Sequence, residues 1–317
     1  MPTVALLGAL LACSEPPGAS APVGAGDFAA RSAVPGAPPV PFADVDLAAY
    51  LDCAREQGVA LLQAHRAGDR PGAAENSLAA IAASLADGAV FVEIDVARSA
   101  DGVLVLMHDD TVDRTTNGSG RVADMTYDEL AALSLVDVDG RATGEAVPTL
   151  AAALAALDGR GFAQIDRKRS TSFEEIATAV EAAAATDRTM VITYSIDEAI
   201  ALSQRMPGVM LSTGIDSRDD VAALRRAGVG LERVTAWLGL GSGRPDWDAQ
   251  LAELGIETSY GDFRAEREGR IDYRLMADNG AEIISVDEVP AAAAALDAAG
   301  EALRLLQACP TSRPQAL

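Results

Sequence analysis

Two histidines and one lysine lie in a stretch of about a hundred residues where acidic side chains also gather. The 317-residue sequence contains His65, His108 and Lys168 and no other residue of either type. Each of the three lies at the end of an apolar run that predicts a strand, and His108 and Lys168 also have an aspartate within two residues. The chain has 24 arginines for its one lysine, so coding bias accounts for part of that rarity. Position is therefore the stronger evidence that these residues have a chemical role.

Three carboxylates accompany them. Glu93 and Asp95 are two residues apart in one predicted strand, so both side chains project from the same face. Asp166 and Lys168 have the same spacing at the end of the next strand. Carboxylates that point into a protein interior are costly unless they are paired or bind a metal. Three oxygen ligands suit one hard divalent cation, Ca²⁺ or Mg²⁺.

The basic residues are suited to an anion next to that cation. Arg66 and Lys168 offer hydrogen-bond donors to tetrahedral oxygens, and arginine can do so with two parallel bonds. His65 and His108 can serve as base and acid on opposite sides of a displacement. Neither histidine has a serine or cysteine nucleophile elbow nearby, which disfavours acyl transfer. Each feature alone is more often structural, but their joint placement predicts phosphoryl-ester chemistry.

The alternation of apolar runs with Ala-rich helical segments predicts the fold. Eight such units follow Phe42, which indicates an α/β protein with a TIM-type (β/α)8 barrel. No Gly-x-Gly-x-x-Gly segment follows a strand, so a dinucleotide-binding sheet is disfavoured. In such barrels function lies at the carboxyl ends of the strands, where the candidate residues are found. The predicted strands are 59–64, 90–96, 161–166, 189–194, 209–213, 234–240, 256–260 and 282–286.

His108 lies on an additional apolar run with no helix before it. Asp101 and Gly102 predict a hairpin after the second strand. A two-residue loop would place His108 opposite Asp95, and a longer loop would shift the pairing by about one position. The polar segment 109–150 then predicts a small insertion over the barrel mouth.

Composition limits the partners and the location. A net charge of −22 disfavours nucleic acid as a partner. The apolar run from Val4 to Ala12 predicts the core of a signal peptide. Residues 1–13 are thus a predicted lipoprotein-type signal peptide, whose last residues, Leu-Leu-Ala-Cys, resemble a bacterial lipobox with Cys13 as the lipidated residue. Residues 14–41 predict a flexible Pro/Gly/Ala tether, and 42–317 the barrel. We expect a lipid-anchored protein of the bacterial envelope that faces the periplasm; the alternative is a periplasmic or secreted protein.

The other two cysteines belong to the first and last predicted units. No pair of cysteines has the Cys-x-x-Cys spacing of a zinc or redox site. Cys53 lies in the first predicted helix and Cys309 follows the last. Because the first and last units of a closed barrel are neighbours, the two could form a disulfide in an oxidising periplasm.

The motifs from His65 to Lys168 resemble the signature series of the glycerophosphodiester phosphodiesterase family. The resemblance is dense in this stretch and thin towards the end of the chain. The matching motifs are His65-Arg66, Glu75-Asn76-Ser77, Glu93-Ile94-Asp95, Asp101-Gly102, His108-Asp109, Asp113-Arg114-Thr115-Thr116-Asn117-Gly118, Val147-Pro148-Thr149-Leu150 and Gly280-Ala281-Glu282-Ile283-Ile284-Ser285-Val286-Asp287.

The resemblance implies a TIM barrel with a small insertion and the same roles for the residues already singled out. It implies Ca²⁺ or Mg²⁺ at Glu93, Asp95 and Asp166, and the two histidines as acid and base. It adds Glu75 as a further candidate ligand, near the metal or the glycerol hydroxyls, and Asn76 as a residue that orients its neighbours at the substrate. The family often has Glu-Ile-Lys where this chain has Asp166-Arg167-Lys168. A tryptophan motif common on the seventh strand is absent from 255–260, which bears on substrate choice.

We therefore expect a metal-dependent hydrolase of lipid metabolism that converts glycerophosphodiesters to glycerol 3-phosphate and an alcohol. One alternative is a lysophospholipase D-like enzyme, or another lipid phosphodiesterase, on the same barrel. The other is an envelope lipoprotein that binds phosphodiesters without cleaving them, which the complete set of site residues speaks against. The sequence leaves open the head group, the choice between Ca²⁺ and Mg²⁺, and whether the protein is a monomer or a small homo-oligomer.

Overall fold

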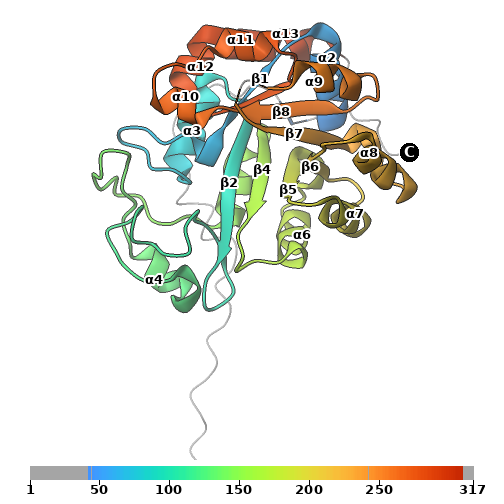
Figure 1. The fold of residues 1–317 in the computed structure, drawn as a ribbon. Coiled ribbons are helices and arrows are strands. Elements are labelled where there is room, and N and C mark those ends of the chain that lie inside the picture. Colours follow the sequence, from blue (N-terminus) through green and yellow to red (C-terminus); the bar gives the residue numbers. More distant parts are fainter. Residues whose placement is uncertain (1–41, 44, 242, 310–317) are drawn as a thin grey trace, which may run out of the picture. The chain divides into compact units, whose positions relative to one another are not determined.

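Eight parallel strands close into a barrel in the computed structural model, which describes residues 42–43, 45–241 and 243–309. The first strand pairs with both the second and the last, so the sheet closes on itself. The predicted TIM-type barrel is confirmed, and every strand lies within two residues of its predicted ends (Figure 1). The barrel strands are β1 (Leu61–Ala64), β2 (Phe91–Arg98), β4 (Phe162–Arg167), β5 (Thr189–Thr193), β6 (Met210–Gly214), β7 (Val234–Leu240), β8 (Glu257–Gly261) and β9 (Ile283–Val286).

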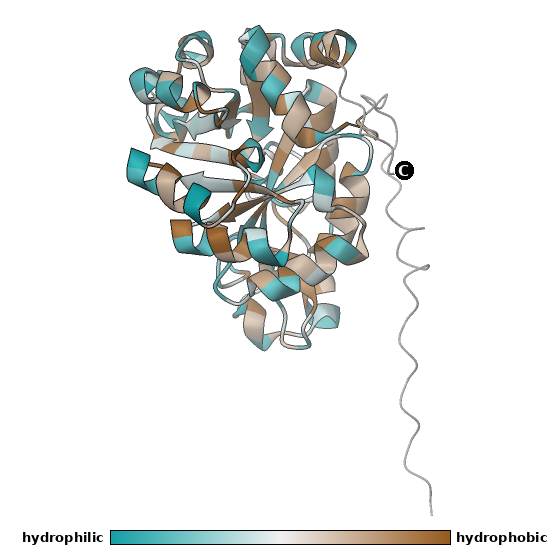
Figure 2. Cartoon of the chain, turned by 90° about the vertical axis from the view of Figure 1, so that its right-hand side faces the viewer, coloured by the Kyte–Doolittle hydropathy of each residue, from teal (hydrophilic) through white to brown (hydrophobic). Residues whose placement is uncertain are grey.

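Helices surround the barrel, and many begin at a serine or threonine. Ser77, Thr149, Ser172, Ser195 and Ser217 each accept a hydrogen bond from the backbone N–H three residues on, which supplies a partner for a free donor of the first turn. Figure 2 shows hydrophilic and hydrophobic residues alternating along the helices, as expected for elements with one face on the sheet and the other in water. The helices outside the insertion are α2 (Leu47–Gln57), α3 (Leu78–Asp87), α5 (Leu150–Leu157), α6 (Phe173–Ala182), α7 (Ile196–Arg205), α8 (Arg218–Arg226), α9 (Pro245–Ala252), α10 (Phe263–Arg267), α11 (Tyr273–Asp278), α12 (Val289–Leu296) and α13 (Ala298–Ala308).

Large apolar side chains close the amino end of the barrel. Phe91 and Phe162 point inward with ring centroids 5.5 Å apart, and Tyr50 of α2 packs against the same cluster. The alternate residues Val92, Ile94 and Val96 of β2 belong to the core between the barrel and the surrounding helices. The layer at the amino end is mainly apolar, although Glu257, the first residue of β8, is buried at the same end and accepts a hydrogen bond from Arg55 of α2 at 3.0 Å.

The hairpin after β2 returns in a register one position away from the two-residue loop expected from the sequence. Its second strand, β3 (Leu104–Leu106), is antiparallel to β2. Met107, rather than His108, lies opposite Asp95, and its N–H donates to the Asp95 carbonyl at 3.0 Å. The shift of one position is the one expected for a loop longer than two residues, so the two-residue loop, and the pairing of His108 with Asp95 that depended on it, are excluded. The turn has three residues, and Gly102 takes a φ of 89°, which suits the longer hairpin loop.

The segment between β3 and α5 has a small core of its own. It contains the 3-10 helix η2 (Val122–Asp124) and α4 (Tyr127–Ala131). Figure 1 shows it beyond the carboxyl end of β2, where the sequence predicted the insertion 109–150. This packing ties the segment to the outer end of the hairpin. The buried apolar residues of its core are Ala74, Ala97, Val105, Met107, Val112, Val122, Leu130, Leu135 and Val147.

A disulfide joins the first described helix to the residue that follows the last. Cys53 of α2 and Cys309 have Cα atoms 6.3 Å apart and are bonded through their sulfurs, the pairing considered from the sequence. Cys13 and the predicted signal and tether segments, 1–41, lie outside the described residues. In the part of the chain that the structure describes, no helix has both the length and the apolar composition needed to cross a membrane.

A buried glutamate at the amino end of the barrel makes stability depend on pH. Glu282 is 4% exposed, and its Oε2 accepts the Thr258 N–H at 2.7 Å. Burial first, and then the nearby Asp248 and Glu257, raise the pKa of Glu282 to about 8. The folded chain therefore keeps a proton on Glu282 that an exposed glutamate loses near pH 4.5. Between these values the folded state binds more protons than the unfolded state, and the free energy of unfolding falls as pH rises.

Glu282→Gln should remove this loss because the amide stays neutral. We expect its melting temperature at pH 9 to exceed that of the unchanged chain by roughly 5 °C, with little difference at pH 5. Differential scanning calorimetry across this range measures both. The same substitution at exposed Glu253 of the α9 C-cap is the matched control. Equal curves for the Glu282 variant and the unchanged chain would contradict the assignment.

Candidate active site and metal centre

A strained turn directly after β1 carries two of the predicted site residues. The 3-10 turn His65–Ala67 has positive φ values of 50° at Arg66 and 65° at Ala67. That conformation costs a residue with a side chain about 1 kcal/mol or more. The Arg66 N–H offsets part of the cost by donating to Glu93 Oε2 at 2.7 Å. The turn thereby links the end of β1 to the acids of β2.

Three buried carboxylates converge at the ends of β2 and β4. Asp95 and Asp166 are partners across the two strands, and Glu93 stands two residues before Asp95 on the same face. One oxygen from each of the three lies within 4.8 Å of the other two. Their exposed fractions are 4% for Glu93, 1% for Asp95 and 8% for Asp166. Burial first, and then repulsion from the two aspartates, raise the pKa of Glu93 well above its ordinary range, so the cluster favours a positive charge.

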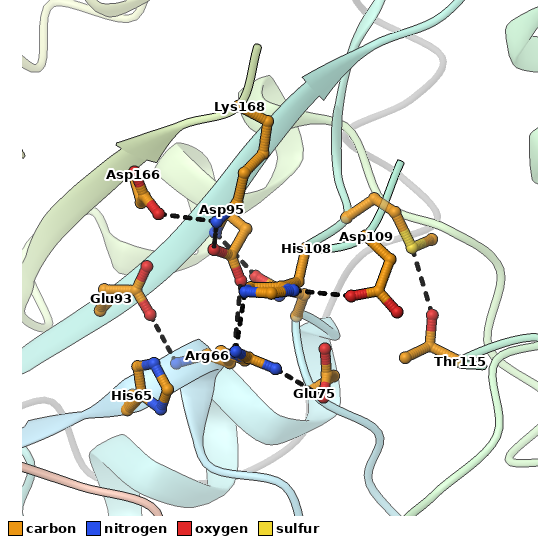
Figure 3. Close-up of polar contacts among 12 residues, drawn as sticks. His65, Arg66, Glu75, Glu93, Asp95, His108, Asp109, Thr115, Asp166 and Lys168 are labelled. Atoms are coloured by element: carbon orange, nitrogen blue, oxygen red, sulfur yellow. Dashed lines mark hydrogen bonds and ion pairs between the residues drawn. The ribbon is translucent and has the colours of Figure 1, made fainter. Parts of the chain in front are cut away.

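Lys168 lies between two of these carboxylates. Its Nζ is 2.5 Å from Asp95 Oδ1 and 2.6 Å from Asp166 Oδ2 (Figure 3). Burial alone would lower the pKa of Lys168, but attraction to the two carboxylates outweighs it and raises the pKa, so the ammonium stays charged. The other Asp166 oxygen accepts a hydrogen bond from the Tyr194 hydroxyl at 2.6 Å. Both oxygens of the third acid are therefore held in place.

Asn76 and Glu75 support the cluster from the segment that precedes α3. Asn76 Nδ2 donates to Asp95 Oδ2 at 2.7 Å, and the Asp95 N–H donates to Asn76 Oδ1 at 2.9 Å. This reciprocal pair fixes the orientation of the Asp95 carboxylate. Glu75 has both oxygens engaged by Arg114, at 2.7 and 2.8 Å. Arg66 lies 3.6 Å from the same carboxylate.

Each histidine has its Nδ1 on an aspartate. His65 Nδ1 is 2.7 Å from Asp287 Oδ1, and His108 Nδ1 is 2.7 Å from Asp109 Oδ1. Because an ionised carboxylate only accepts, Nδ1 carries the proton and Nε2 remains for proton exchange. Hydrogen bonding from Arg114 is the main cause that lowers the pKa of Asp109 to about 2, so this partner stays ionised.

Arg66 connects the two halves of the site. Its Nη2 donates to His108 Nε2 at 2.7 Å, and Figure 3 shows the guanidinium reaching from the β1 turn towards His108 on one side and Glu75 on the other. Its Nε is also 3.9 Å from Asp95. In this arrangement His108 is neutral, with a proton on Nδ1 and an accepted hydrogen bond on Nε2.

A cavity of about 350 Å³ opens beside the carboxylates. Gln63 and Gln164 line it, with their amides joined by a hydrogen bond of 2.6 Å. Trp237 and Phe263 also line it, and the Phe263 ring stacks on the His65 imidazole at 4.1 Å between centroids and 14° between planes. The cavity therefore combines hydrogen-bonding groups with flat apolar surfaces.

The donor set fits a divalent cation. The cluster offers carboxylate oxygens, which hard cations prefer. Two of its three acids, Asp95 and Asp166, are register partners on neighbouring strands, so their relative position is fixed by the sheet. Three protein oxygens leave positions for water or for oxygens of a substrate. Of the residues predicted as ligands, Glu93, Asp95 and Asp166 are brought together by the structure. Glu75, the further candidate, is outside this cluster, and both of its oxygens accept hydrogen bonds from Arg114.

The structure also assigns neighbours that sequence reasoning left without a role. Tyr194 and Asp287 directly follow β5 and β9, and the strand-end rule could have singled them out. Arg114 lies within a quoted motif, yet its pairing with Glu75 depends on the fold of the insertion. Phe263 carries no local signal, because its contact with His65 depends on where α10 packs.

The sequence model of the Glycerophosphoryl diester phosphodiesterase family matches residues 65–239, more than half of the chain. The chain belongs to this family. The matched range begins at the first histidine, includes the three carboxylates and Lys168, and ends within β7.

Curated members of the family match a shorter part of the chain. It is 52% identical over 71 residues to glycerophosphodiester phosphodiesterase 1 of Rattus norvegicus, which is 22% of this chain and 21% of the rat protein. It is 44% identical over 91 residues to a glycerophosphodiester phosphodiesterase of Caldanaerobacter subterraneus subsp. tengcongensis, which is 28% of this chain and 37% of that protein. The matched stretch thus spans about a fifth to about two fifths of these relatives.

Solved structures of family members match most of the barrel. A glycerophosphoryl diester phosphodiesterase of Parabacteroides distasonis has a TM-score of 0.67 and 25% identity over 81% of this chain and 90% of its own. One from Agrobacterium tumefaciens has a TM-score of 0.60 and 26% identity over 74% of this chain and 100% of its own. An Oleispira antarctica phosphodiesterase in complex with the product sn-glycerol-3-phosphate has a TM-score of 0.60 over 77% of this chain and 99% of its own; at 19% identity it shows a shared fold.

Asp95→Asn should weaken binding of Mg²⁺ and Ca²⁺ by at least about 100-fold, because it removes one of three charged ligands and disturbs the Asn76 pair. Isothermal titration calorimetry on the folded variant measures the affinity without any substrate. Exposed Asp110→Asn is the matched control. An unchanged affinity in the Asp95 variant would remove this residue from the metal centre.

Proposed function

We propose that this chain hydrolyses glycerophosphodiesters to glycerol 3-phosphate and an alcohol. The observation that carries the proposal is the placement of two aspartate-bound histidines, His65 and His108, in one site with three clustered carboxylates. Membership of the family supports the reaction type. The product complex of the Oleispira antarctica relative supports glycerol 3-phosphate as the product class.

Glu93, Asp95 and Asp166 would hold one divalent cation, Ca²⁺ or Mg²⁺. When bound, the cation would neutralise negative charge on a phosphate oxygen and so act as a Lewis acid. Lys168, in contact with two of the three acids, supplies a further positive charge at the same place. These positive charges would attract an anionic phosphodiester to the site, although the net charge of the whole chain is −22.

His65 is the general base in this proposal. Its Nδ1–H donates to Asp287, which leaves the Nε2 lone pair to take a proton from the glycerol 2-hydroxyl or from water. Phe263 keeps the ring in one plane by stacking on it. The deprotonated oxygen attacks phosphorus, and the bond from phosphorus to the oxygen of the leaving alcohol breaks. Attack by water gives glycerol 3-phosphate directly; attack by the 2-hydroxyl gives a cyclic glycerol phosphate, and a water molecule then opens the ring by breaking the bond from phosphorus to the 2-oxygen.

His108 is the general acid and gives the proton on its Nε2 to the leaving alkoxide. Asp109 stabilises the imidazolium that this role needs, because Arg114 keeps its carboxylate ionised. The Arg66 guanidinium, 2.7 Å from Nε2, turns to the phosphate oxygens before His108 takes up that proton. The negative charge of the bound phosphate thus draws Arg66 away from His108, so that His108 Nε2 can take up a proton from water when the substrate is present.

The proposed location is the bacterial envelope, with a lipid anchor on Cys13. The apolar run that ends in Leu-Leu-Ala-Cys supports the anchor. The Cys53–Cys309 disulfide supports an oxidising compartment such as the periplasm.

His65→Ala and His108→Ala should each reduce turnover of glycerophosphocholine by about 10²–10⁴-fold, because each removes a positioned proton carrier. Glycerol 3-phosphate release, measured after chelation and add-back of Mg²⁺ or Ca²⁺, gives the rate. Asp110→Ala, next to Asp109 but exposed, is the control. Near-normal rates in both histidine variants would overturn their assignment.

A second candidate, hydrolysis of lysophospholipids, is favoured by the apolar rim of the same site. Tyr194 is 68% exposed and Leu240 is 70% exposed, at or just beyond the carboxyl ends of β5 and β7. Trp237 and Phe263 line the cavity with Tyr194. A single acyl chain leaving the cavity would cover these surfaces and remove them from water.

Leu240→Ser distinguishes the two substrates. If an acyl chain lies on the rim, the kcat/KM for lysophosphatidylcholine should fall by about tenfold, since one exposed leucine would be buried on binding. The kcat/KM for glycerophosphocholine, which has no acyl chain, should change by less than about twofold. Choline release measures both reactions. Equal effects on the two substrates, or no cleavage of the lysolipid by the unchanged chain, would exclude this candidate.

A further inference from the structure

The short helix α10 reaches His65 by two separate routes. Phe263, at its first position, stacks on the imidazole. Glu266, one turn later, faces the protein interior with 7% of its surface exposed. Glu266 does not contact the histidine; it contacts the backbone that carries the partner of the histidine. One helix therefore controls both the plane of the ring and the group at its Nδ1.

The Glu266 carboxylate accepts three hydrogen bonds. Its Oε2 accepts the Asp287 N–H at 2.8 Å, and its Oε1 accepts the Glu288 N–H at 3.2 Å. The Tyr273 hydroxyl, from α11, donates to Oε1 at 2.8 Å. A buried carboxylate needs such donors, and here two of the three come from consecutive residues at the end of β9. The contact joins α10, α11 and the loop between β9 and α12 at one point.

Asp287 needs this support because its own side chain is not enclosed. Its side chain is 36% exposed, and Arg267 competes for its second oxygen at 3.8 Å. A carboxylate on an unsupported loop could turn to water or to the arginine. With its backbone N–H bound to Glu266, Asp287 instead presents Oδ1 to His65 Nδ1 at 2.7 Å.

We propose that Glu266 is a positioning residue for His65. It fixes the backbone of Asp287, Asp287 fixes the proton on His65 Nδ1, and Nε2 is left as the acceptor that faces the cavity. The effect on turnover rests on the proposed function, in which His65 is the base. The effect on the tautomer of His65 does not, and it can be observed without any substrate.

The histidine content of the chain makes the tautomer directly measurable. With ¹⁵N-labelled histidine, long-range ¹H–¹⁵N correlation spectra of the full chain contain signals from His65 and His108. A His108→Ala sample assigns them. At about pH 8, where imidazole is ordinarily neutral, the unchanged chain should show His65 as the Nδ1–H tautomer.

Glu266→Gln should replace that pattern by averaged signals of both tautomers. The amide keeps the shape but places an NH₂ group against one of the backbone N–H donors. We expect kcat to fall by about tenfold, the scale for a hydrogen-bond partner one step behind a functional histidine, with KM changed by less than about twofold. In an Asp287→Asn background the same substitution should have little further effect, because both act through one contact.

Glu268→Gln is the matched control, because Glu268 is exposed at the end of the same helix and accepts hydrogen bonds from Arg264 and Arg270. Equal spectra and equal kcat in the Glu266 and Glu268 variants would overturn the proposal. If Glu266→Gln does not fold, Tyr273→Phe takes its place, because it keeps the carboxylate and removes one of its donors. A shift of the His65 signals in that variant would support the proposal, and unchanged signals would overturn it. A tautomer change in a chain without phosphodiesterase activity would support the positioning role and reject the proposed function.

Discussion

The burial of three carboxylates at the ends of two adjacent strands is the constraint around which the site is built. Parallel pairing places Asp95 beside Asp166, and the period of the strand adds Glu93 to the same face. Left alone, such a cluster would be strongly unfavourable in the interior. The Lys168 ammonium and the Asn76 amide both contact Asp95, and the strained turn after β1 donates a backbone N–H to Glu93. A group that neutralises the cluster is what the local electrostatics favours.

The two histidines are chemically alike at Nδ1 but are supported by different parts of the fold. His65 directly follows β1 of the barrel, and its partner Asp287 directly follows the last strand. His108 follows the hairpin, and its partner Asp109 is held by Arg114 from the insertion. Arg66 spans the gap between these two structures. The insertion is therefore part of the site, because it determines the environment of one of the two histidines.

The layers of the barrel explain why the two sides of the cavity differ chemically. Buried apolar side chains, among them Phe91 and Phe162, fill the amino end, and the amide pair of Gln63 and Gln164 lines the cavity. Towards the mouth, the charged groups come from β1, β2 and β4, whereas the aromatic groups Tyr194, Trp237 and Phe263 follow from the later strands. The opening thus has a charged side and an apolar side.

What the sequence determined by itself is what depends on local periodicity. The eight strands, the shared face of Glu93 and Asp95 and the strand-end positions of the site residues follow from alternation along each strand and from the rule that parallel strands end together. Only the tertiary structure decided the hairpin register, because a three-residue turn and a two-residue turn are equally compatible with the apolar pattern. It alone placed Phe263 on His65 and Glu266 beneath Asp287, since these contacts join segments about two hundred and about twenty residues apart. No period along the chain encodes where a short helix packs against a distant strand end.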